Sequence, residues 1–143
     1  MPLNKENIQV KLKQLEEYIS AVVKMRQIPE SKFVEKSDVE ILAERHIEKA
    51  CQAALDIANH IVAEKGLGTV TMYRELGFIL AKSKIVPNGM AEKLAKIAGF
   101  RNRLVHEYAN LSPKFIYQIV HQDIEDLTEF AKLIYTYLQK TGK

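Results

Sequence analysis

The sequence predicts an all-α fold, a bundle of four main helices and one short helix within a single domain of residues 1–143. Three observations lead to this prediction. Apolar residues recur in steps of three and four, the spacing of one helical face. Most of the 6 glycines and 4 prolines lie between these periodic stretches or at their ends, where they break helices. No stretch alternates apolar and polar residues for long enough to predict a strand.

The first helix is predicted over residues 4–27, and the second begins at Ser37 or Asp38, both good capping residues. The second helix runs to Lys65, just before Gly66. Its apolar face is rich in alanine, which indicates that another helix approaches closely. The predicted buried residues are Ile8, Leu12, Leu15, Ile19 and Val22 in the first helix, and Val39, Ala43, Ile47, Ala50, Ala54, Ala58 and Ile61 in the second.

Three further helices follow. A short one is predicted over residues 72–83 and a longer one over residues 90–108, with a Pro-Asn-Gly turn between them. The last helix starts with Ser112 as its cap and Pro113 at its first position, where proline is favoured. Its predicted buried residues are Ile116, Ile119, Val120, Leu127, Phe130, Ile134 and Leu138.

The composition narrows the class of protein without giving a function. The formal net charge is +3, from 21 basic and 18 acidic residues, which permits binding to a polyanion but does not argue for it. No apolar run is long enough for a transmembrane helix, and the first residues lack the apolar core of a secretory signal. The single cysteine, Cys51, cannot form an internal disulfide. We therefore expect a cytoplasmic protein that has no membrane partner.

One residue of the fourth helix breaks the hydrophobic pattern. With about 100° of rotation per residue, Arg101 falls in the middle of the apolar stripe formed by Leu94, Ile97, Leu104 and their neighbours. A guanidinium keeps its charge, so burying it without a partner is costly. Either Arg101 pairs with an acid on a neighbouring helix or reaches out to solvent, or it lines a site that binds an anion. The periodicity leaves both interpretations open.

Asn102 and His106 accompany Arg101 on this helix. They are four residues apart and face each other, whereas His106 lies roughly 140° around the helix from Arg101. Arginine therefore needs its full length to share a site with His106. A single histidine on a helix is more often a packing or surface residue than a catalytic one, and the pattern alone does not decide between these roles.

The second helix carries a polar stripe opposite its alanine face, made of Arg45, Gln52, Asp56 and Asn59. Its default interpretation is a solvated face. The functional alternative is a second wall of a cleft, in which Asp56 pairs with an arginine or orients a histidine.

The remaining histidines do not have the spacing of a metal site, and one cysteine cannot form a thiolate cluster. The sequence also lacks a glycine-rich phosphate loop and a serine nucleophile motif. We therefore expect neither a metal nor a cofactor.

The octet from Arg101 to Tyr108, Arg-Asn-Arg-Leu-Val-His-Glu-Tyr, resembles the signature of HEPN-domain ribonucleases. That signature is an arginine, commonly followed by a polar residue, and a histidine after a spacer of four to six residues. The tyrosine two residues after the histidine is similar to the HepT branch of toxins. Arg45 and the segment 53–60 are similar to the second helix of that branch, so the resemblance covers most of the chain.

The resemblance implies a HEPN-like bundle that acts as an endoribonuclease toxin without a metal, with RNA, including tRNA, as substrate. It implies a homodimer in which the motif helices face each other and two Arg/His sets form one cleft. Arg101, Asn102 and His106 are then the catalytic residues, with Asp56 and Asn59 as supporting candidates. The implied partner is a minimal nucleotidyltransferase antitoxin of the MNT type, with Tyr108 as the candidate tyrosine for AMP attachment.

Two other functions compete with the nuclease. The first is a non-catalytic HEPN-like module that binds nucleotides or a partner protein. The second is an antitoxin-like or oligomerising bundle with no role in nucleic-acid chemistry. The combination of Arg101, Asn102 and His106 favours the enzyme, because a pure scaffold gains nothing from an arginine in its apolar stripe.

Overall fold

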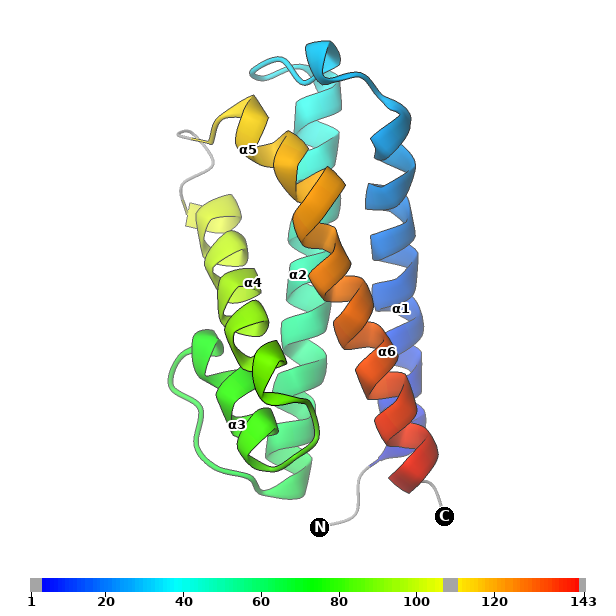
Figure 1. Ribbon diagram of the computed structural model, residues 1–143, viewed down its shortest axis with the longest axis vertical. Helices are drawn as coiled ribbons and strands as arrows, with labels where there is room; N and C mark the ends of the chain where they lie inside the picture. Colours follow the sequence, from blue (N-terminus) through cyan, green and yellow to red (C-terminus); the bar gives the residue numbers. More distant parts are fainter. Residues whose placement is uncertain (1–3, 107–110, 142–143) are drawn as a thin grey trace.

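The computed structural model describes residues 4–106 and 111–141, and most of these residues are helical. Figure 1 shows an antiparallel bundle in which α1 and α4 run upward and α2 and α6 run downward. The helices are α1 Lys5–Lys24, α2 Asp38–Lys65, α3 Leu76–Lys82, α4 Asn88–His106, α5 Pro113–Gln118 and α6 Ile124–Thr141. The described residues contain no strand, which confirms the predicted all-α class.

Side chains cap the helices where the sequence predicted them. The Ser37 hydroxyl accepts a hydrogen bond from the Glu40 amide at 3.2 Å, and the Ser112 hydroxyl accepts one from the Phe115 amide at 3.2 Å. Each bond satisfies one of the amides that a helix start leaves without a partner. Gly66 ends α2 in the left-handed conformation, with a φ of 62° that suits glycine. The capping residues thus set the ends of the elements.

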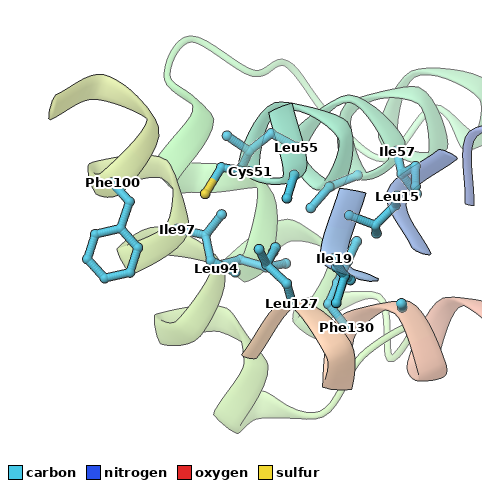
Figure 2. Close-up of a cluster of buried hydrophobic side chains, with 14 of the residues drawn as sticks. Leu15, Ile19, Cys51, Leu55, Ile57, Leu94, Ile97, Phe100, Leu127 and Phe130 are labelled. Carbon is cyan, nitrogen blue, oxygen red and sulfur yellow. The ribbon is translucent and has the colours of Figure 1, made fainter. Parts of the chain in front are cut away.

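The 28-residue helix α2 is the centre of the bundle and contacts α1, α3, α4, α5 and α6. Its predicted alanine face is buried, and Val39 is the one residue of that stripe that is only half-buried. Figure 2 shows side chains of α1, α2, α4 and α6 meeting in one cluster, with Cys51 of α2 facing Ile97 of α4. Small residues on α2 let several helices share one core.

The last helix was predicted as one uninterrupted element, but the structure divides it. A π-helical turn, Ile119–Asp123, separates α5 from α6. Arg26, which follows α1, donates from Nε to the backbone oxygen of Val120 at 2.9 Å. Its Nη2 also forms an ion pair with Glu125 at 2.7 Å. A wider helical turn leaves a carbonyl available for this side-chain donor.

The third helix also differs slightly, because a 3₁₀ turn, Tyr73–Glu75, precedes α3. The buried residues predicted for the first and last helices are all buried. The predicted fourth helix extends past His106 to Tyr108, which lies outside the described residues. Among the helices of the described segments, none is both long and apolar enough to cross a membrane.

Candidate active site

Arg101 is half-buried on α4, between α2 and the turn that precedes α3. Its Nε donates a hydrogen bond to Oε1 of Gln52 on α2 at 2.8 Å. Its Nη1 donates to Oδ1 of the adjacent Asn102 at 3.0 Å. The guanidinium carbon lies 5.3 Å from the ring centre of Tyr73, within the range of a cation–π contact. Three groups from three parts of the chain therefore hold this guanidinium.

Gln52 links Arg101 to the carboxylate of Asp56. Its amide nitrogen donates to Oδ1 of Asp56 at 2.9 Å, while its amide oxygen accepts from Arg101. A glutamine amide has both a donor and an acceptor, so it can connect a cation to an anion without a charge of its own. Asp56, the acid considered as a partner for an arginine, therefore contacts Gln52 and not Arg101. The uncharged amide of Gln52 is the group that contacts the guanidinium directly.

Arg101 keeps N–H donors beyond the two used by Gln52 and Asn102. Within the described residues it forms no salt bridge, so no protein carboxylate neutralises it at short range. A planar guanidinium with a fixed position and available donors is suited to a phosphate, which it can bind through two parallel hydrogen bonds. The arrangement is compatible with an anion site and accounts for an arginine in an apolar stripe.

His106 is exposed and is the last described residue of α4. In the described segments, no hydrogen bond joins it to Arg101 or to Asn102, and the hydrogen bond of Asn102 is with Arg101 instead. The angular count along the helix predicted the separation of His106 from Arg101, whereas it placed Asn102 on the same face as His106, and the structure pairs Asn102 with Arg101 instead. The structure of one chain therefore groups Arg101 with Asn102, Gln52 and Asp56, but it does not bring His106 to them.

The other predicted residues of the polar stripe behave as a solvated surface. Arg45, Asp56 and Asn59 are exposed, and Arg45 forms a long ion pair with Glu48 at 3.8 Å. Asn59 lies on the same helix as Asp56, one turn further along. Tyr108, the candidate modification site, lies outside the described residues.

Sequence reasoning did not single out Gln52 or Tyr73 as supports of Arg101. Gln52 appeared only as a member of the polar stripe. The one usable signal was the spacing of Gln52 and Asp56, which are four residues apart and face each other on a helix.

A second arginine anchors the next element to the motif helix. The guanidinium carbon of Arg103 lies 4.0 Å from the ring centre of Phe115 on α5, and Phe115 packs edge-to-face on Phe100 at 5.6 Å. Arg103 and Arg101 lie on different sides of α4 and contact different elements. Arg103 thus has a packing role, which leaves Arg101 as the arginine of the candidate site.

The sequence matches the model of the ribonuclease HepT-like family over residues 8–134, nearly the whole chain. The chain belongs to this family. It is 30% identical over 89 residues to the mRNA nuclease HepT of Shewanella oneidensis, covering 62% of this chain and 67% of that protein. It is 26% identical over 131 residues to the tRNA nuclease HepT of Aphanizomenon flos-aquae, covering 92% of this chain and 89% of that protein.

The fold of the HepT-like chain is also similar to that of a solved toxin. This toxin is the tri-AMPylated HEPN toxin of Shewanella oneidensis, in complex with an MNT antitoxin. The TM-score is 0.80 at 25% identity, and the similarity covers 90% of this chain and 96% of the toxin. The predicted class, an endoribonuclease toxin of the HepT-like family, is confirmed by these relatives.

Proposed function

We propose that this HepT-like chain cleaves RNA through Arg101 and His106, with Asn102 assisting Arg101. The observation that carries the proposal is the fixed guanidinium of Arg101, held by Gln52, Asn102 and Tyr73 with donors still available. Such a group binds the scissile phosphate and stabilises the charge that develops on its oxygens during the reaction.

The reaction uses the ribose 2′-hydroxyl as the nucleophile. His106 takes the proton from this hydroxyl, the 2′-oxygen bonds to phosphorus, and the bond from phosphorus to the 5′-oxygen breaks. The leaving 5′-oxygen then receives a proton from the imidazolium. Histidine suits both steps because its ordinary pKa lies near neutral pH. The products are a 2′,3′-cyclic phosphate and a 5′-hydroxyl, and the steps assigned to the chain require no metal.

The test is the variant His106→Ala, assayed on total RNA in the presence of EDTA. We expect the wild type to cleave under these conditions and the variant to lose activity by on the order of 10² to 10⁴, the usual contribution of general acid–base catalysis. His60→Ala is the matched control, because His60 contacts Asn7 and Glu64 far along α2 from the motif.

Undiminished cleavage by His106→Ala would contradict the proposal, and circular dichroism checks that the variant keeps its helices. A wild-type chain that binds RNA but never cleaves it would favour the non-catalytic module instead.

The proposed active form is a homodimer in the cytosol, in which α4 of one chain faces α4 of the other. The exposed position of His106 supports this arrangement, because the side chain is open to a second subunit. For the target we propose RNA as a class, with tRNA and mRNA as the first substrates to compare. The curated relatives are named for one or the other of these RNAs.

We further propose that an MNT-type antitoxin pairs with the chain and attaches AMP to Tyr108. The similar Shewanella toxin is tri-AMPylated and in complex with an MNT antitoxin, which supports the idea. The negative charge of attached AMP groups would repel RNA and compete with it for the guanidinium of Arg101.

Mass spectrometry after co-expression with the antitoxin tests this modification. We expect one or more AMP additions on a peptide that contains Tyr108, and none in the Tyr108→Phe variant. A neutralised wild-type toxin with an unmodified Tyr108 would refute it.

A further inference from the structure

A polar groove lies between α1 and α2, next to the candidate site. Its volume is about 270 Å³. We call it the α1–α2 groove and define it by the lining residues that matter here, Lys11, Tyr18, Arg45, Lys49, Gln52 and Asp56. This volume is below the range of about 300–1,000 Å³ that is typical of small-molecule sites. The groove therefore suits part of a larger ligand better than a whole cofactor.

Helix geometry explains why these residues meet. Lys11 and Tyr18 are seven residues apart on α1, and Arg45 and Gln52 are seven apart on α2, so each pair lies along one side of its helix. The two helices are antiparallel neighbours (Figure 1). The polar stripe of α2 thus has a partner on α1, which the sequence analysis did not identify.

The charges of the groove favour an anion. Within the described residues, neither Lys11 nor Lys49 forms a salt bridge, whereas Glu48, which also lines the groove, pairs with Arg45 at 3.8 Å. The carboxylate of Asp56 accepts the hydrogen bond of Gln52. Three cations, Lys11, Arg45 and Lys49, and two carboxylates, Glu48 and Asp56, give the lining a net charge of +1, and within the described residues the two lysine ammonium groups are in no salt bridge.

The groove also has an aromatic surface. The ammonium of Lys49 lies 5.9 Å from the ring centre of Tyr18, which is half-buried. A cationic groove that carries an aromatic ring is the combination that binds single-stranded nucleic acid, because the cations contact phosphates and the ring stacks on a base.

Gln52 joins the groove to the candidate site. It lines the groove on α2, and its amide oxygen contacts Arg101 at 2.8 Å. A strand whose scissile phosphate lies at Arg101 therefore has an adjoining path along α2 towards Lys49 and Tyr18.

We propose that the α1–α2 groove is a binding subsite for the RNA segment next to the scissile phosphate. Lys11 and Lys49 bind backbone phosphates, and Tyr18 stacks on a base. This inference rests on the proposed function and adds the residues that hold the substrate.

The first experiment measures the affinity of the full chain for single-stranded 2′-O-methyl RNA of mixed sequence, which lacks the nucleophile and stays intact. We expect the affinity of the double variant Lys11→Ala, Lys49→Ala for this RNA to be about tenfold lower than that of the wild type. The slope of log affinity against log salt is negative, and its magnitude should fall by roughly 1.4, for two lost phosphate contacts. The control is Lys13→Ala, Lys24→Ala, which removes two exposed lysines of α1 outside the groove lining.

The second experiment addresses the ring. Tyr18→Leu should weaken binding by roughly 5- to 100-fold, the range for one lost base stack, and Tyr18→Phe should retain wild-type affinity. In cleavage assays on natural RNA, the groove variants should raise KM and leave kcat nearly unchanged.

Equal affinities of the groove variant and its control would overturn the subsite. A groove variant that keeps its RNA affinity but no longer co-purifies with the antitoxin would overturn it too, since the groove would then be a protein interface. Because binding is measured without cleavage, either result leaves the roles of Arg101 and His106 intact. Failure of the His106→Ala test would instead remove the nuclease mechanism.

Discussion

The most informative contact at the residue scale is the one between Arg101 and Gln52. A glutamate at position 52 would place a negative charge directly on the guanidinium and compete with a phosphate ligand. The neutral amide fixes the side chain while leaving its charge available, and Asp56 fixes the amide in turn. This arrangement favours a ligand site over a structural ion pair.

Substitution of Gln52 tests this difference. Gln52→Ala should lower kcat/KM about tenfold, because it removes one hydrogen bond to a charged group that positions Arg101. Gln52→Glu should be more harmful, because the new carboxylate neutralises Arg101. Steady-state kinetics on RNA measure both variants, with Gln9→Glu on the exposed side of α1 as the charge control. If Gln52→Glu retained full activity, Arg101 would not be the phosphate ligand.

The sequence could reveal Arg101 but not its supports. A cation in an apolar stripe is visible within one helix, since the periodicity is local. Gln52 is 49 residues away along the chain, and Tyr73 belongs to a turn between helices. Contacts of this kind depend on how elements pack, which a single sequence does not specify.

At the scale of the elements, local signals predicted most boundaries. Ser37, Gly66 and Ser112 act at the ends where the sequence placed them, because caps depend only on nearby backbone groups. The sequence did not predict the π turn before α6, since the backbone oxygen of Val120 in this turn accepts a hydrogen bond from Arg26, which is 94 residues away. Boundaries set by distant side chains are therefore the part of the fold that sequence patterns do not show.

Two glycines in helices should respond oppositely to substitution by alanine. A Cβ at Gly99 of α4 meets nothing within 4 Å, so Gly99→Ala should raise the free energy of unfolding by about 0.5–1 kcal/mol. A Cβ at Gly77 of α3 would lie 2.7 Å from the backbone oxygen of Ala91 on α4. Gly77→Ala should therefore lower the free energy of unfolding by about 1–3 kcal/mol.

Urea unfolding followed by circular dichroism measures both glycine variants. An unchanged or higher free energy of unfolding for Gly77→Ala would show that the packing of α3 on α4 does not require a glycine at position 77, and a lower one for Gly99→Ala would contradict the prediction for α4.

At the scale of the whole molecule, the positions of Arg101 and His106 bear on assembly. Arg101 points toward α2 and the turn before α3, whereas His106 is exposed at the end of the described part of α4. Within the described residues of one chain no hydrogen bond joins the two groups, but a pair of chains related by a twofold axis can place His106 of one beside Arg101 of the other.

Complementation between two inactive variants tests a shared site. Arg101→Ala and His106→Ala should each be inactive alone. Each mixed dimer contains one site with an intact arginine from one chain and an intact histidine from the other, so the purified heterodimer should show about half of the wild-type activity. Cleavage of RNA by purified, differently tagged heterodimers is the measurement. No recovery in verified heterodimers would place both groups of a site in the same chain.

The buried thiol of Cys51 also has a practical consequence. Burial first, and the nearby charge of Glu48 second, raise its pKa to about 12, so the thiol hardly ionises at neutral pH. Maleimide and disulfide reagents attack the thiolate, and they will spare Cys51 in the folded chain. Spin labels or fluorophores can therefore be attached to cysteines introduced on the surface without first removing the native one, and distances between subunits can be measured in the otherwise natural sequence.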